Sequence, residues 1–316
     1  MATFSHSSRQ PLRAEILILL PGIWVDGQRF DEALTGAGGA HESPEDSTIR
    51  FLVAPGCKLK IDATLRLLSL ANQLANRGRL VCIEFGDTTG AMGYLDRMGF
   101  FDHLDAGVRV LPERPAGSAA QRYRGNNGSL VEIAAIARRS RDATLPGRLT
   151  SALQAACEQR PDATALGNAA WLLFAELVAN VYDHSETPLD GYAALQLYPG
   201  GKNVQVAVAD SGLGIITTLR PALARESPYL AGLSDLDLVV EMFQKGVSRY
   251  GRSRGSGLAG CAAKAIRFDA TLDVRLPRQH LTLEPHSGSY AVARAVGRVD
   301  LAEVWGTQVC FNFRLP

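Results

Sequence analysis

The feature that most constrains the fold is a change in sequence character between residues 112 and 129. This stretch, "PERPAGSAAQRYRGNNGS", is rich in Pro, Gly, Asn and Arg, whereas apolar runs lie on both sides of it. Such a composition is typical of a boundary between compact segments. The chain has 316 residues, a length that favours two domains. We therefore predict a first domain over residues 1–117, a linker over 118–128 and a second domain over 129–316.

Apolar patterning before the boundary predicts alternating strands and helices. The run "RLVCIEF" (79–85) is short, apolar and continuous, as in a strand with a covered face. Residues 62–78 carry Leu at helical spacing, with Asp62 as the expected cap and Gly78 at the end, which predicts a helix. The Gly- and acid-rich residues 34–47 predict a loop. Further strands are expected at 14–22, 48–56 and 107–112, and a short helix at 88–104.

The same criteria predict a second mixed segment after the boundary. Helices are expected near 129–140, 145–158, 164–184, 235–245 and 257–267. Strands are expected at 191–199, 203–210, 271–276, 289–297 and 307–315. The whole chain is therefore predicted to belong to the α/β class.

Composition narrows the class of protein further. With 46% hydrophobic residues the chain can bury a sizeable core, and a net charge of +1 does not indicate nucleic-acid binding. The five cysteines are scattered and form no CxxC pair, which fits a reducing compartment. No run of eighteen apolar residues occurs, and the apolar stretch Ile16–Leu20 is too short for a signal peptide. We expect a cytoplasmic protein without a membrane span.

One predicted helix carries polar residues where an apolar face is expected. In "ELVANVYDHS", Glu176, Asn180 and His184 recur at a spacing of four and so share one face. Taken alone, Glu176 and His184 would be an ordinary solvated helix edge. Only downstream motifs give this row another meaning.

Three further motifs follow in order. The run "VQVAVADSGLGI" places Asp210 after a strand, with Gly212 and Gly214 allowing a sharp turn beside a ligand. "GRSRGSGL" (251–258) precedes a predicted helix, whose first backbone N–H groups can face an anion. "WGTQVCFNFRLP" (305–316) places Thr307 at the start of a closing strand. Each is common on its own: Asp-Ser-Gly is good turn chemistry, and Arg249, Arg252 and Arg254 could belong to a solvated loop rather than contact phosphate.

Together and in this order, the four motifs resemble those of the GHKL (Bergerat-fold) ATPases, over roughly residues 129–316. That family includes histidine-kinase catalytic domains, gyrase-type and heat-shock chaperone ATPases, and anti-sigma-factor serine kinases. The resemblance implies a two-layer α/β sandwich that binds ATP with Mg²⁺. It also implies that residues 215–254 form a lid over the nucleotide, which we expect to have few apolar anchors because Pro, Gly and charge fall at irregular spacing.

The resemblance implies a role for each matching residue. Asn180 would be the Mg²⁺ ligand, and Asp210 would accept a hydrogen bond from the adenine amino group. Glu176 would be a general base, and Thr307 would support the adenine pocket. His184 would lie beside Asn180 in a supporting position. The remaining matches are Gly212, Gly214 and Ile215 around the base, and Arg254, Gly255, Gly257 and Leu258 under the phosphates.

A second resemblance concerns the N-terminal segment, which looks like a STAS domain, the fold of anti-sigma-factor antagonists. In that family an Asp-Ser-Ser-Gly stretch opens a helix and its second hydroxyl residue accepts phosphate. Here the stretch is Asp62-Ala63-Thr64-Leu65: Thr64 keeps a hydroxyl, whereas Ala63 and Leu65 depart from the pattern. Thr64 could equally be a plain first-turn helix residue.

The two resemblances together imply an ATP-binding regulatory protein with a protein partner, and three alternatives stay open. The first is phosphoryl transfer of the serine/threonine-kinase type, or slow hydrolysis. The second is a nucleotide-gated scaffold without turnover. The third is a mechanical ATPase that forms a homodimer on binding ATP. Glu176 favours chemistry, because binding alone needs no carboxylate beside the γ-phosphate.

Overall fold

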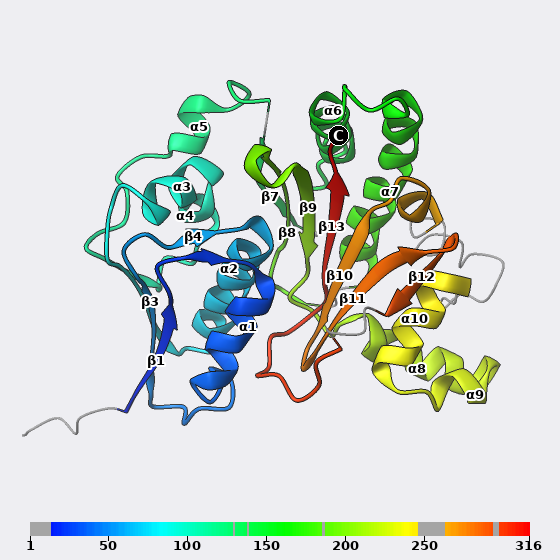
Figure 1. The fold of residues 1–316 in the computed structure, drawn as a ribbon. Coiled ribbons are helices and arrows are strands. Elements are labelled where there is room, and N and C mark those ends of the chain that lie inside the picture. Colours follow the sequence, from blue (N-terminus) through cyan, green and yellow to red (C-terminus); the bar gives the residue numbers. More distant parts are fainter. Residues whose placement is uncertain (1–13, 129, 138, 185–186, 246–262, 293–296) are drawn as a thin grey trace, which may run out of the picture.

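A computed structural model describes residues 14–316, except for 129, 138, 185–186, 246–262 and 293–296. Its described part is mixed α/β, with a parallel sheet near the N-terminus and a separate antiparallel sheet after it (Figure 1). The coarse α/β prediction is therefore confirmed.

The parallel sheet has four strands in the order β1-β3-β5-β6. Ile49, Phe51 and Val53 of β3 point to the core, and the residues between them are partly exposed, as expected for a strand with one covered face. Helices α1 and α2 cover the inner face, with a small parallel pair, β2 and β4, beside them. The elements are β1 (Glu15–Leu20), β2 (Trp24–Val25), α1 (Gly27–Gly36), β3 (Thr48–Val53), β4 (Lys58–Leu59), α2 (Ile61–Asn76), β5 (Leu80–Phe85), α3 (Ala91–Met98), α4 (Phe100–His103) and β6 (Arg109–Leu111).

The antiparallel sheet has seven strands in the order β12-β11-β10-β13-β9-β8-β7. The closing strand β13 lies between β10 and β9, so the end of the chain is central to the sheet (Figure 1). The elements are α5 (Ala119–Tyr123), β7 (Leu130–Ile136), α6 (Leu145–Ala156), α7 (Ala163–His184), β8 (Gly191–Tyr198), β9 (Asn203–Ala209), α8 (Ile215–Glu226), α9 (Pro228–Ala231), α10 (Asp235–Lys245), β10 (Thr271–Leu276), β11 (Gln279–His286), β12 (Ser289–Val292) and β13 (Gln308–Arg314).

Helix α2 is shared by both halves of the molecule. It contacts β5 of the parallel sheet and also β8 and β9 of the antiparallel sheet, whose other side packs against α6 and α7. Its leucines are buried, and so are its polar residues Arg66, Ser69 and Gln73. These three residues recur at spacings of three and four, so they form a polar stripe on one face of the helix. In Figure 1 the helix lies between the two sheets.

Charged side chains cross this contact between the halves. Asp31 of α1 accepts hydrogen bonds from Arg66 of α2 and from Arg275 of β10, the latter at 3.0 Å. Arg275 also donates to the carbonyl oxygens of Leu276 and Ala302. All three charged residues are at most 3% exposed. Because a buried charge is costly unless paired and hydrogen-bonded, this triad fixes how the halves pack.

Several predicted elements differ from the structure. The helix expected near 129–140 is wrong: Leu130–Ile136 form β7, because pairing with β8 overrides the weak helical preference of an alanine-containing run. The expected loop at 34–47 begins inside α1, which the sequence did not reveal. The expected helix 88–104 is divided at Gly99, which has a φ of 79°. Asp62 is not the cap of α2, since Lys60 takes that position.

The remaining differences lie near the end of the chain and in the expected linker. Strand β11 was missed between two predicted strands. Helix α5 lies within the linker predicted at 118–128, and its Ala120 is buried. The other long helices and strands are confirmed within a few residues, except that residues 257–262 of the helix expected at 257–267 and residues 293–296 of the strand expected at 289–297 lie outside the described residues.

The expected lid has more apolar anchors than its sequence suggested. Its described part, 215–245, forms α8, α9 and α10. Leu219 and Leu223 of α8, and Leu238 and Val239 of α10, are all buried in the same cluster as the sheet. The expectation of few apolar anchors is therefore wrong for residues 215–245. Residues 246–254 lie outside the described residues.

Helix α7 is the one element of the described chain that is long and apolar enough to cross a membrane. The window Ala163–Asp183 meets the criterion by length and composition only. The core helix of a soluble protein meets the same criterion, and α7 packs against α6 and the sheet.

Candidate functional site

Asp210 lies at the end of β9, where backbone N–H groups hold its side chain in place. One carboxylate oxygen accepts a hydrogen bond from the backbone N–H of Gly212 at 2.7 Å, and the other accepts from the N–H of Thr307 at 3.0 Å. The N–H of Asp210 donates to the carbonyl of Thr307, also at 3.0 Å. Two hydrogen bonds thus orient this carboxylate, and the third fixes the backbone of Asp210 beside β13.

Thr307 joins three parts of the site. Besides its two backbone bonds to Asp210, its hydroxyl accepts from the N–H of Ile215 at 2.8 Å. Ile215 is the first residue of α8, and Gly214 before it has a φ of 80°, which favours glycine. The turn after β9, the start of α8 and the start of β13 are therefore held together by the backbone and hydroxyl of one residue.

Gly306 allows the close approach of β13 to Asp210. It has a φ of 87°, and a Cβ added there would clash with the carbonyl oxygen of Asp210. Only glycine accepts both the conformation and the contact. This role of Gly306, directly before Thr307, was not predicted from the sequence.

A small cavity lies between these loops and α7. Its volume is about 50 Å³, and its polar lining comes from Asn180, Asp210 and Thr307. The apolar lining comes from Leu177, Val181, Val208, Gly214, Ile215 and Val309. Small-molecule sites usually measure roughly 300–1,000 Å³, so this volume can hold only one end of a ligand.

The electrostatics of the cavity centre on Asp210. Burial raises the pKa of its carboxyl to about 6, and the hydrogen bonds from Gly212 and Thr307 oppose that rise. The carboxylate form therefore predominates at pH 7 and can accept a further hydrogen bond from a ligand.

Asn180 brings an unpaired amide to the same cavity. Its Nδ2 atom is buried and has no hydrogen-bond partner among the residues that the structure describes. A buried amide group without a partner is costly, so the position fits contact with a ligand. Glu176 lies one turn earlier on α7 and is partly buried, but it does not line the described cavity.

The structure thus brings together Asn180, Asp210, Gly214, Ile215 and Thr307, with Gly212 bonded to Asp210. Glu176 shares a helix with Asn180 without reaching the cavity. The expected phosphate-binding residues lie outside the described residues: Arg249, Arg252, Arg254, Gly255, Gly257 and Leu258.

A metal ion at this site would depend on the ligand as well as on the protein. Among the described residues no group of three His, Cys, Asp or Glu side chains could hold a metal ion. Mg²⁺ is commonly held by one or two protein oxygens together with substrate phosphates and water. The single amide of Asn180 fits that mode, and it does not fit a metal site made by protein alone.

A contact that was not predicted from the sequence reaches this site from the N-terminal half. Gln73 of α2 donates to the hydroxyl of Ser211 at 3.1 Å and to the carbonyl of Trp305 at 3.2 Å. Its amide oxygen accepts from the N–H of Trp305 at 3.0 Å. Gln73 therefore ties α2 to the residues next to Asp210 and Gly306. The polar stripe on α2 was the signal that could have indicated this contact.

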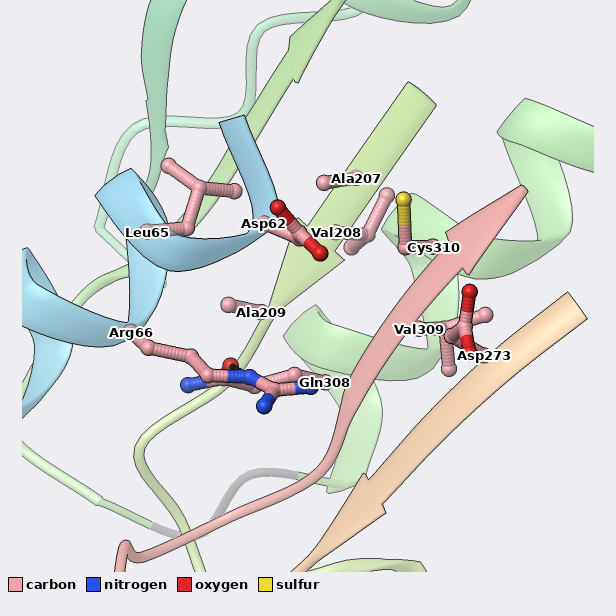
Figure 2. Close-up of a pocket in the computed structure, with 10 residues that line it drawn as sticks. All are labelled: Asp62, Leu65, Arg66, Ala207, Val208, Ala209, Asp273, Gln308, Val309 and Cys310. Carbon is pink, nitrogen blue, oxygen red and sulfur yellow. Dashed lines mark hydrogen bonds between the residues drawn. The ribbon is translucent and has the colours of Figure 1, made fainter. Parts of the chain in front are cut away.

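A second set of contacts on the polar stripe of α2 lies around a much smaller cavity, of about 10 Å³ (Figure 2). There Arg66 donates to the side-chain oxygen of Gln308 at 3.1 Å, and Asp62 accepts from the N–H of Gly27 at 2.8 Å. Burial raises the pKa of Asp62, and the nearby Arg66 opposes the rise. A volume this small holds about one water molecule, so the cavity belongs to the packing between the halves.

Thr64 lies in the same packed layer. It is 0% exposed, so no kinase can reach its hydroxyl in this conformation. The structure therefore favours the reading of Thr64 as a first-turn helix residue.

Comparisons with known proteins leave the family to be argued from these residues. Neither a scan against protein-family models nor a search of curated proteins gives a match.

Proposed function

We propose that residues 130–316 bind ATP together with Mg²⁺, in the manner of the GHKL ATPases that the motifs resemble. The observation that carries this proposal is the Asp210 carboxylate, which two backbone N–H groups orient at a cavity also lined by Asn180. A carboxylate has about four acceptor positions, so two stay available to a ligand.

The chemistry of Asp210 favours adenine over guanine. The adenine amino group can donate to a carboxylate, whereas guanine presents a carbonyl oxygen at the equivalent position. The apolar side chains around Asp210 suit a flat base. Asn180 and the nucleotide phosphates would hold Mg²⁺ between them, and the cation would neutralise phosphate charge.

Two outcomes for the bound nucleotide follow from the position of Glu176. If the γ-phosphate lies near Glu176, this carboxylate can orient an attacking water or hydroxyl group, which gives hydrolysis or phosphoryl transfer. Glu176 does not line the described cavity, which can hold only one end of a ligand, so the alternative of a nucleotide-gated scaffold stays open. In both cases the contacts of Gln73 offer a path from the nucleotide to the N-terminal half and its protein partner.

Incubation with γ-labelled ATP and Mg²⁺ tests the proposal and separates its two forms. Label retained on dialysis, and displaced by unlabelled ATP but not by GTP, is the expected sign of adenine-specific binding. Free phosphate or labelled protein would then indicate turnover, which Glu176→Ala should lower roughly a hundredfold. Retention of label without any turnover would support the scaffold. Absence of saturable retention would overturn the proposed function.

A further inference from the structure

A second, larger cleft lies at the other end of β9. It has a volume of about 1,040 Å³ and is lined by β4, the start of α3, and the hairpin that joins β8 to β9. Asp210 follows the last residue of β9, whereas the cleft meets its first residue, Asn203. Seven strand residues span roughly 20 Å, so the cleft is distinct from the candidate nucleotide site.

Aromatic side chains form much of the cleft wall. Trp24 and Tyr198 meet edge to face with ring centroids 5.9 Å apart, and Tyr94 also lines the cleft. Trp24 is 46% exposed, so a large part of its ring is open to water in the cleft. Leu59, Leu130 and Leu197 extend the apolar surface. A ligand with a flat apolar group would bury aromatic surface here that is otherwise exposed to water.

The charge of the cleft is one-sided. Its described lining includes Lys58, Lys60 and Arg97 but no Asp or Glu. Arg97 is paired with Glu132 at 2.6 Å, and Lys60 lies 3.7 Å from Asp26 at the margin.

Lys58 carries the uncompensated part of that charge. Its ammonium group lies 5.5 Å from the centre of the Trp24 ring, and it has no acidic partner within the described residues. Lys58 and Lys60 are two residues apart across the end of β4, so they extend toward the same side.

We propose that this cleft binds a small amphipathic organic anion. Its flat apolar body would lie against Trp24 and Tyr198, and its carboxylate, sulfonate or phosphate group would lie at Lys58 and Lys60. The volume is at the upper end of the range for small-molecule sites, and the mostly apolar lining with few polar groups is typical of them. Because the walls come from both halves of the chain, the ligand would bridge them.

Fluorescence titration of the full chain with 8-anilinonaphthalene-1-sulfonate tests the proposal. We expect saturable binding of one dye per chain, with energy transfer from tryptophan that Trp24→Leu reduces and Trp171→Leu does not. Trp171 is a matched control because it is similarly exposed, at 51%, but lies on α7. Saturating Mg²⁺-ATP should leave the dye bound, since the two sites are distinct.

The charge requirement is tested by substituting the lysines. Lys58→Met combined with Lys60→Met should weaken dye binding by about fivefold or more, the effect of losing one or two partly exposed ion pairs. Arg225→Met removes an exposed charge from α8 and should have no effect. The uncharged N-phenyl-1-naphthylamine should bind the parent and the double variant alike.

Three results would overturn the proposal. They are an unchanged dye affinity in the lysine variants, an equal loss for the charged and the uncharged dye, and displacement of the dye by ATP. If the double variant fails to fold, the single change Lys58→Met decides the question, because Lys58 is exposed and its contact with the Trp24 ring is of the weak kind found at exposed sites.

Discussion

At the scale of single residues, the site depends on a few backbone-directed contacts. Asp210, Gly306 and Thr307 hold the ends of β9 and β13 together, and Asn180 faces them from α7.

Gly306→Ala should destabilise the protein by more than about 1 kcal/mol, because alanine is strained at a φ of 87° and its Cβ would clash with Asp210. The urea midpoint of unfolding measures the effect. Gly36→Ala is the matched control: nothing lies within 4 Å of a Cβ at that helical position, so it should be neutral or slightly stabilising. Equal midpoints for the two variants would show that the turn at Gly306 is not required.

The raised pKa of Asp210, about 6, predicts a pH dependence of nucleotide binding. The carboxylate is mostly ionised at pH 7 and mostly protonated at pH 5, so ATP affinity should fall about tenfold over that interval. ATP itself titrates nearby, so Asp210→Asn provides the background to subtract. A pH profile that is the same in the parent and the variant would contradict this assignment.

The same shift has a consequence for stability. An unfolded Asp titrates near pH 4, so between about pH 4 and pH 6 the folded chain binds more protons than the unfolded chain at this position. The contribution of Asp210 to stability is therefore greatest at low pH and is lost as pH rises through 6.

At the scale of elements, α2 is the helix that packs against both sheets. Its leucines pack in the N-terminal core, and its polar stripe bonds to the antiparallel sheet through Arg66 and Gln73. Through Gln73, the loops around Asp210 are therefore hydrogen-bonded directly to the N-terminal half.

Gln73→Ala should loosen the loops around Asp210. Ser211 and Trp305 would lose their partners, at a cost of about 1–3 kcal/mol for each group left buried and unpaired. Hydrogen exchange should rise in peptides covering 204–215 and 303–310, and ATP should bind more weakly. Asn76→Ala, at an exposed position of the same helix, is the control. Unchanged exchange in both peptides would show that α2 does not position the site.

The elements that could be predicted from the sequence are those with strong periodicity and clear end signals. Helices α2 and α7 and the paired strands β8 and β9 followed from their own residues. β7 was mistaken for a helix because its partner, β8, lies more than fifty residues away, and a local pattern carries no information about that pairing.

The candidate site was predictable where chemistry lies in a short motif. Asp210, Gly214 and Thr307 meet as their order in the chain implied. Gln73 could not be assigned, because its partners lie 138 and 232 residues away in the sequence.

At the scale of the whole molecule, the two sheets pack on the same helix and share buried charges. Asp31, Arg66 and Arg275 come from both halves, and removing one partner of such a buried group typically costs about 3–5 kcal/mol. We therefore expect one cooperative unit, although two sheets suggest two.

Hydrogen exchange at increasing urea measures that cooperativity. Peptides from β3 and β5 and peptides from β9 and β13 should lose protection at the same urea concentration. Loss of protection in the parallel sheet at a clearly lower concentration would show that the N-terminal half unfolds independently and that the buried triad does not couple the halves.

The most direct test of the central claim is calorimetric titration of the full chain with ATP and GTP in the presence of Mg²⁺. The account predicts that ATP binds more tightly than GTP, and that Asp210→Asn weakens ATP binding by about 1.5–3 kcal/mol, the worth of a hydrogen bond to a charged group. Asp269→Asn, at an exposed position away from the cavity, should bind ATP like the parent. Equal affinities for ATP and GTP, or an unaltered ATP affinity in Asp210→Asn, would contradict the claim that Asp210 recognises adenine.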